Sequence, residues 1–202
     1  MVLPSAPIPA CPACGRPPGS TLACLHCGRL IEEAPGATHF QRLGLPAGER
    51  IDRAALEAAY LKLSRRLHPD FHGGADEDAR ALALRNSALL NEAYAVLSDD
   101  EQRAEYLLGL HDPQALERWK NLPPDFLMQA METSEAVEGA ARNGDRPALA
   151  RLAAGVRRDI DERMQRLADA RSWQRPDARA LATLLHELRV FRRILRDAEK
   201  AA

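Results

Sequence analysis

The chain has 202 residues, 28 basic and 29 acidic side chains, and a formal net charge of −1. This length allows one or two domains with a core of their own. The balanced charge excludes an overall positive field for binding nucleic acid or an anionic membrane. No apolar run is long enough to span a bilayer, and the first ten residues lack the features of a secretory signal. We therefore expect no nucleic-acid or membrane partner, and a reducing compartment in which disulfides are rare.

Helix-forming residues dominate the composition, and only 4% of the residues are aromatic. Ala, Leu, Arg and Glu all favour helices, and no convincing period-two strand pattern is present. The composition therefore predicts an all-α chain. Residues 1–10 are rich in proline, and we expect them to form a disordered lead-in.

Two Cys-x-x-Cys pairs follow the lead-in, with nine residues between Cys14 and Cys24; the four cysteines are Cys11, Cys14, Cys24 and Cys27. Each pair can wrap one edge of a metal ion, and a glycine, which tolerates positive φ, comes directly after each pair. Four thiolates at this spacing predict one structural zinc ion in a closed tetrahedral site, within a module of residues 11–33. A redox-active dithiol pair or unligated cysteines are the alternatives.

Residues 37–111 have the pattern of two long helices flanked by two short ones. Asp52 is the expected N-cap of the first long helix, and Ser98 or Asp99 that of the last short one. The stripe of the first long helix has steps of four, three and four, through Leu56, Tyr60, Leu63 and Leu67. Pro69 removes an N–H donor and disfavours helical φ and ψ at His68, so this helix ends there.

A basic helix face precedes that proline. Lys62, Arg65 and Arg66 lie away from the Leu63 and Leu67 stripe, and the turn that follows is His68–Pro69–Asp70. A positive face that ends in a rigidly held carboxylate suits docking to an acidic protein surface. By itself the tripeptide is a weak signal, and a turn after a solvated basic face is the alternative.

Residues 112–124 read as a linker, and residues 125–200 as three helices joined by short turns, which predicts an antiparallel bundle. We expect the first helix to end near Gly144, the second to span about 146–171 and the third to begin around Pro176. The stripe of the third alternates steps of three and four, through Leu181, Leu184, Leu188, Phe191 and Leu195.

The first bundle helix has two apolar faces. On a helical wheel, Phe126, Ala130 and Val137 share the face that suits the core. The opposite face carries Leu127, Met128, Met131, Glu132 and Glu135. Methionine adapts to varied contacts, and an exposed apolar patch edged by carboxylates indicates a protein partner. Packing against residues 37–111 is the alternative.

Several longer stretches carry a family resemblance. "HFQRLGLP", "AYLKLSRRLHPDFH" and "SALLNEAYAVLSDDEQRAEYLLGL", in this helix order, resemble a J-domain. "RAEYLLGLHD" and "FLMQAMETSE" resemble, more narrowly, the HscB family of J-type co-chaperones of iron–sulfur cluster biogenesis. The resemblance covers about residues 37–200. The cysteine pairs resemble the tetracysteine extension found in some members of that family, notably eukaryotic ones.

The resemblance implies an all-α fold: a zinc-knuckle module, a J-domain at 37–111 that is a helical hairpin with two flanking short helices, and a three-helix client-binding bundle at 125–200. It implies a non-enzymatic co-chaperone with two protein-binding sites. The site for a DnaK-type chaperone, called HscA in bacteria, would comprise Lys62, Arg65, Arg66, His68, Pro69 and Asp70. The site for an IscU-type iron–sulfur scaffold would comprise Leu127, Met128, Met131, Glu132, Glu135 and Phe191. Phe191 also lies on the core stripe, where bundle packing is the alternative.

Several points stay open. Rival functions are a J-domain protein with another client, and a redox sensor that works through zinc or the thiols. The expected compartment is the bacterial cytoplasm, or the mitochondrial matrix for a mature eukaryotic form. A homodimer stays open, and so does the surface that the zinc module contacts.

Overall fold

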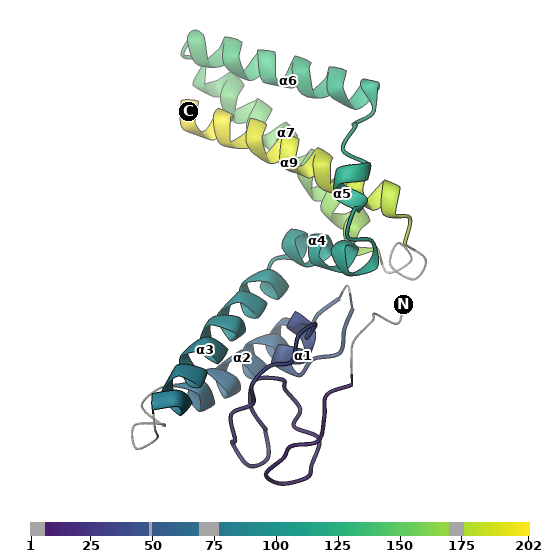
Figure 1. Cartoon of the computed structure of the whole chain (residues 1–202). Helices are drawn as coiled ribbons and strands as arrows, with labels where there is room; N and C mark the ends of the chain where they lie inside the picture. Colours follow the sequence, from purple (N-terminus) through teal and green to yellow (C-terminus); the bar gives the residue numbers. More distant parts are fainter. Residues whose placement is uncertain (1–6, 49, 69–76, 170–175) are drawn as a thin grey trace. The chain divides into compact units, whose positions relative to one another are not determined.

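The computed structural model describes residues 7–48, 50–68, 77–169 and 176–202. Within these residues every regular element is a helix, and β-type pairing is limited to one isolated antiparallel bridge between Ala23 and Leu30 (Figure 1). The all-α prediction is confirmed. None of the helices in these ranges has an apolar stretch that would cross a bilayer. The chain divides into two compact units, residues 1–103 and 104–202, which are described separately.

The first unit contains α1 (His39–Leu43), α2 (Arg53–Leu67) and α3 (Glu77–Ser98). Thr38 and Gln41 form a capping box at the start of α1, in which each side chain accepts the backbone N–H of the other residue. Asp52 caps α2 as expected, because its carboxylate accepts the Ala54 N–H at 2.9 Å. These caps satisfy N–H groups that a helix start leaves unpaired.

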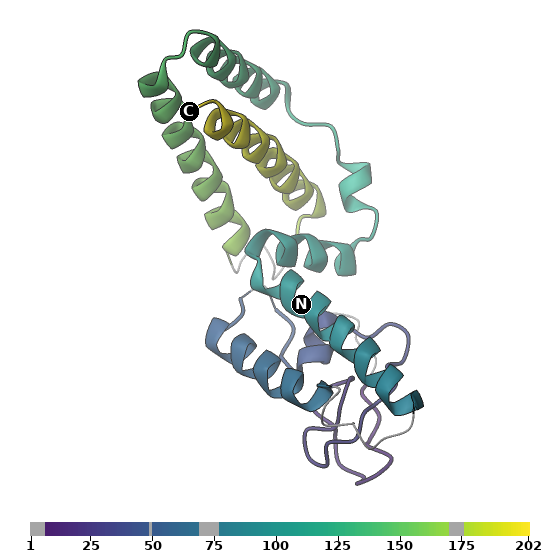
Figure 2. The ribbon, with the colours of Figure 1, turned by 90° about the vertical axis from the view of Figure 1, so that its left-hand side faces the viewer.

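α2 and α3 form an antiparallel hairpin, which Figure 2 shows as two adjacent helices. The Tyr60 hydroxyl donates to Asn91, whereas the Ser87 hydroxyl donates to the Leu67 carbonyl, so later residues of α2 meet earlier residues of α3. Burial of apolar side chains between these helices and α1 provides the main stabilisation of the unit. The buried side chains are Phe40, Leu43, Leu56, Leu63, Leu67, Ala83, Leu90, Ala93 and Leu97.

Asp99 precedes α4 (Asp100–His111) and caps it, because its carboxylate accepts the N–H groups of Glu101 and Gln102. Of the two expected caps, Ser98 and Asp99, the structure therefore has Asp99. The boundary between the two compact units falls inside this helix, after Arg103. The buried Arg103 donates to the Leu97 carbonyl at the end of α3, which ties the start of α4 to the first unit.

The second unit contains α5 (Ala115–Arg118), α6 (Pro124–Arg142), α7 (Arg146–Ala168) and α9 (Ala178–Ala201). α5 lies within residues 112–124, for which the sequence predicted only a linker. Asp112 stabilises this short helix, because its carboxylate accepts the Gln114 N–H and pairs with Arg118 at 2.7 Å. A single helical turn is too short to give a periodic signal in the sequence.

α6, α7 and α9 pack as a three-helix bundle (Figure 1). Ion pairs of Arg157 with Glu199 and of Arg163 with Glu187 join later residues of α7 to earlier residues of α9, so these helices are antiparallel. Gly144, with φ of 65°, ends the turn from α6 to α7 as expected. Asp177 caps α9, so Pro176 precedes this helix instead of opening it, and α7 ends at Ala168 rather than about 171.

Candidate functional site

The four cysteines come together in the tetracysteine module, residues 11–33. Their sulfur atoms all lie within 4.8 Å of one another. The Cys11–Cys27 and Cys14–Cys24 sulfur distances are both 3.7 Å. A tetrahedral zinc–thiolate site with bonds of about 2.3 Å requires sulfur separations of about 3.8 Å. The donor set therefore fits one zinc ion with four protein ligands, which would make the site structural.

Each cysteine pair forms its own knuckle of backbone hydrogen bonds. The Gly15 N–H donates to the Cys11 carbonyl at 2.8 Å, and the Gly28 N–H donates to the Cys24 carbonyl at 2.9 Å. Both glycines have positive φ, 70° and 81°, which explains why glycine follows each pair. The knuckles hold both thiols of a pair on one side of the turn, where a single ion can reach them.

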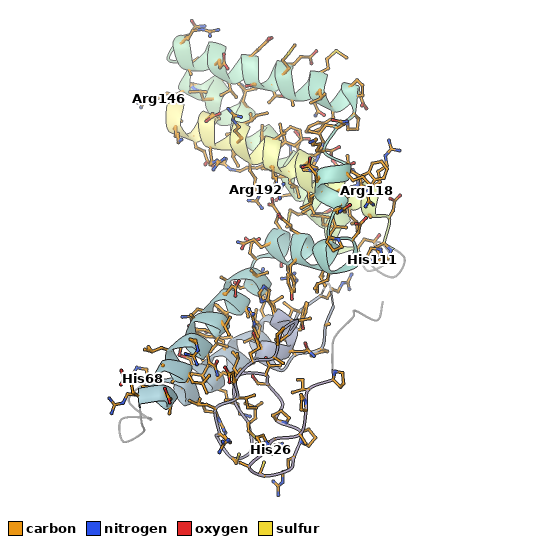
Figure 3. The ribbon with its side chains drawn as sticks, in the orientation of Figure 1. His26, His68, His111, Arg118, Arg146 and Arg192 are labelled. Atoms are coloured by element: carbon orange, nitrogen blue, oxygen red, sulfur yellow. The ribbon has the colours of Figure 1, made fainter. Side chains whose placement is uncertain are left out.

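The backbone of the second knuckle also favours a thiolate. The N–H of Cys27 lowers the pKa of the Cys24 thiol to about 6, against the opposing effect of burial, and the N–H of His26 acts in the same direction. Metal ligation requires the deprotonated form of cysteine. Cys24 is therefore suited to be a metal ligand at neutral pH, whereas His26, labelled in Figure 3, lies outside the group of clustered ligands.

The tetracysteine module contacts all three helices of the first unit. The Asn86 side chain on α3 donates to the carbonyls of Leu22 and Ile31, at 2.7 and 2.8 Å. Arg66 on α2 donates to the Cys24 carbonyl at 3.0 Å. These contacts answer a question that the sequence left open. Neither Asn86 nor the role of Arg66 was found from the sequence, because their acceptors are main-chain carbonyls, which every residue has.

An ion pair joins the module to α1 as well. Arg42 binds Glu33 of the module through two nitrogens, and both side chains are largely buried. Arg42 also pairs with Glu92 of α3 at 2.7 Å. The Ser20 hydroxyl donates to the Arg42 carbonyl at 2.6 Å. The C-cap of α1 is therefore close to the chain that leads into the second knuckle.

We predict that Gly44→Ala destabilises the first unit more than Gly36→Ala does. Both glycines have positive φ, so both substitutions introduce similar backbone strain. Only at Gly44 does an added Cβ collide with the module, at 2.1 Å from the Gly19 carbonyl oxygen, whereas nothing lies within 4 Å of one at Gly36. Thermal unfolding of both variants measures the difference, which we expect to exceed about 1 kcal/mol. Equal stability would mean that module and α1 separate without cost.

The basic residues of α2, predicted to bind a chaperone, lie partly in solvent and partly against the tetracysteine module. Lys62 and Arg65 are exposed on α2, whereas Arg66 is half-buried against the tetracysteine module. His68 is exposed and extended, with ψ of 130°, at the C-terminal end of α2 (Figure 3). Pro69 and Asp70 lie outside the described residues. A positive and accessible face therefore remains around Lys62 and Arg65.

The outward side of α6 carries what we term the α6 contact face: Leu127, Met128, Met131, Glu132 and Glu135. The exposed fractions of Leu127, Met128 and Met131 are 49%, 59% and 60%, and both glutamates are exposed. Phe126, Ala130 and Val137 on the other side of α6 are buried in the bundle. The α6 contact face therefore offers apolar area and negative charge for contact with another surface.

Phe191 is separated from that face. Its exposed fraction is 0%, and its ring meets Phe126 edge-on at 5.2 Å between centroids. The Arg163 guanidinium lies 4.5 Å from the Phe191 centroid and pairs with Glu187. As it lies here, Phe191 presents no surface to a client. It lies in the core of the bundle, against Phe126, the residue before Leu127.

Comparison with known proteins identifies both helical regions. Residues 38–106 match the family model described as DnaJ domain, and residues 122–199 match "HSCB C-terminal oligomerisation domain". A curated relative from Ralstonia nicotianae, "Co-chaperone protein HscB homolog", is 39% identical over 166 residues, which are 81% of this chain and 93% of that protein.

Two solved structures are similar to this one. Chaperone HscB from Vibrio cholerae has a TM-score of 0.65 and 27% identity, over 81% of this chain and 96% of its own. Human co-chaperone protein HscB has a TM-score of 0.75 and 25% identity, over 95% of this chain and 98% of its own. Only about 10 of the 202 residues are unmatched in the human comparison (5% of 202), so the likeness extends into the tetracysteine module. The length, identity and architecture of these matches show that this chain belongs to the HscB family of co-chaperones.

Proposed function

We propose that this chain stimulates ATP hydrolysis by a DnaK-type chaperone of the HscA class and delivers an IscU-type iron–sulfur scaffold to it. The J-domain, through α2 and the turn at His68–Asp70, binds the chaperone. The α6 contact face binds the scaffold. The chain catalyses no reaction of its own, because hydrolysis takes place on the chaperone.

The observation that carries the proposal is the α6 contact face. Three large apolar side chains on adjacent turns are about half exposed or more, beside two exposed carboxylates. Burying them against a partner removes apolar area from water at about 25 cal/mol per Å². The carboxylates at its edge favour a partner with positive charge there and disfavour a negative one. This is the pattern of an apolar centre with a polar rim.

The exposed charges on α2 support the chaperone half of the proposal. Lys62 and Arg65 form a positive surface whose attraction to an acidic partner steers association. Arg66 is a poorer candidate for direct contact than the sequence implied, because the module already uses its guanidinium. We therefore assign chaperone contact chiefly to Lys62, Arg65, His68, Pro69 and Asp70.

The test is steady-state ATP hydrolysis by an HscA-type chaperone with the chain alone, with the IscU-type scaffold added, and with Asp70→Asn. We expect stimulation that rises further with scaffold and is lost, by about 100-fold or more in apparent affinity, when the carboxylate is neutralised. Asp161→Asn is the control, because Asp161 is an exposed carboxylate of α7 and belongs to the second unit. Absence of stimulation with a competent chaperone would refute the proposal.

The same assay separates the rival functions. Stimulation that does not respond to scaffold would indicate a J-domain protein with another client. A redox sensor would instead lose or gain activity when its thiols are oxidised and reduced reversibly, with zinc release measured in parallel. The structural zinc site proposed here keeps its metal under mild oxidant, because four protein ligands close the coordination shell.

Self-association is tested separately by sedimentation of the chain over a range of concentrations. The family model that matches residues 122–199 carries the word oligomerisation in its description. If the chain dimerises and Met131→Ala prevents it, the α6 contact face binds a second copy. A monomer at all concentrations supports binding of the scaffold alone.

We propose the bacterial cytoplasm as the compartment, in line with the bacterial relative.

A further inference from the structure

Asn86 makes a deeply buried polar contact between the tetracysteine module and the J-domain. Its exposed fraction is 1%, although it lies in the middle of α3. The side-chain nitrogen has two N–H groups, and it donates to the carbonyls of Leu22 and Ile31. Asparagine is a poor helix former, so it adds little to the stability of a helix unless its side chain makes contacts of its own. Here both side-chain N–H donors bind carbonyls of the module.

The acceptors of Asn86 stand on either side of the second cysteine knuckle. The Ile31 N–H donates to the Leu22 carbonyl at 3.0 Å, which pairs the segments before Cys24 and after Cys27. Asn86 therefore binds both ends of the loop that carries two of the four ligands. Arg66 binds the carbonyl of Cys24 itself, so α2 contacts the same loop from its own side.

Apart from these bonds and the contacts of Glu33 and Ser20 with Arg42, the module has only a small core of its own. Its buried apolar side chains are Cys11, Pro18, Leu22, Ala23 and Cys24. A segment of about 20–25 residues is too small to fold on a hydrophobic core alone, and such segments depend on metal or disulfides. In structural zinc sites the free energy of metal binding is free energy of folding. The positions of the Leu22, Cys24 and Ile31 carbonyls therefore depend on metal at the four cysteines.

We propose that the tetracysteine module is a metal-dependent clamp on the J-domain. With zinc bound, the loop carbonyls accept hydrogen bonds from Asn86 of α3 and Arg66 of α2 and hold the two helices and α1 together. Without zinc, the loop loses its shape, so the buried Asn86 amide loses both of its acceptors and Arg66 loses the Cys24 carbonyl. Metal occupancy and J-domain stability are then linked, whichever chaperone or client the chain serves.

Hydrogen exchange of the full chain, followed by mass spectrometry before and after zinc is removed with a chelator, tests this link. The zinc content of each sample is measured in parallel. We expect exchange in α1 and α3 to become at least about tenfold faster without zinc, which corresponds to about 1.4 kcal/mol. Peptides from α7 and α9 serve as the internal control and keep their rates. Unchanged rates in α1 and α3 after zinc loss would overturn the proposal.

Matched variants test the route of the coupling. Asn86→Leu removes both donors, so zinc removal should then change exchange in α3 by less than about twofold. Asn91→Leu makes the same substitution at an exposed position of α3. It removes the Tyr60 hydrogen bond of the hairpin but no hydrogen bond to the module, so each variant is compared with its own zinc-bound rate and Asn91→Leu should keep the full response. If Asn86→Leu does not fold with zinc, Arg66→Met against the exposed Arg65→Met replaces the pair. A full wild-type response in Asn86→Leu, or in Arg66→Met when that pair is used, would also overturn the proposal.

Discussion

We expect that replacing Leu127 and Met131 together by alanine weakens binding of the proposed IscU-type scaffold by about 100-fold, or about 2.7 kcal/mol. Anchors at the centre of an interface contribute about 1–2 kcal/mol or more each, and these two are one turn apart on the α6 contact face. Their exposed fractions, 49% and 60%, mean that truncation leaves no cavity in the bundle. Titration calorimetry measures the affinity, and thermal unfolding checks that stability changes by less than about 0.5 kcal/mol.

The control is a second pair of exposed leucines on the same chain. Leu61 on α2 and Leu84 on α3 have exposed fractions of 45% and 59%. Leu61→Ala with Leu84→Ala removes similar apolar area from the J-domain and should leave scaffold affinity unchanged. If this pair weakens binding as much as the α6 pair does, the scaffold does not distinguish the two surfaces. If neither pair matters, the scaffold binds elsewhere or is not the client.

Local patterns carried most of what the sequence predicted correctly. The two Cys-x-x-Cys pairs give ligand spacing directly, and helical periodicity places Leu56, Leu63 and Leu67 on one buried face. The Asp52 cap and the turn at Gly144 have short-range signals of the same kind. Each of these features depends on residues within a few positions of one another, so a single sequence is enough to find it.

Long-range contacts were out of reach for the opposite reason. Asn86 meets Leu22 across 64 positions and donates to its backbone carbonyl, so the Leu22 side chain takes no part in the contact. The sequence placed Arg66 on the same basic face as Lys62 and Arg65. Helical spacing separates core positions from surface positions, but it does not tell a solvent-exposed surface from one that another segment covers. The tertiary packing of residues 11–33 decides which part of the basic face the module covers. The periodicity of the sequence carries no information about that packing.

The second large effect is expected at Phe191. Phe191→Ala should lower the free energy of unfolding of the bundle by about 3–5 kcal/mol, the usual range for truncating a buried phenylalanine. The ring packs edge-on against Phe126 and lies beneath the Arg163 guanidinium, so the substitution also removes an aromatic pair and a cation–π contact. Chemical denaturation, with separate probes for each unit, measures the loss in the second unit alone.

A milder variant separates packing from direct contact at this position. Phe191→Leu keeps most of the buried volume and should cost about 1–1.5 kcal/mol of stability. If the ring acts only by supporting Phe126, and through it the first turns of α6, scaffold affinity should change by less than about threefold at temperatures where the variant is folded. A large loss of affinity at small cost in stability would mean that the bundle opens to let Phe191 touch the client. Phe191 is 0% exposed, whereas Leu127, which directly follows Phe126, is 49% exposed. We therefore expect Phe191 to support the α6 contact face rather than to touch the client.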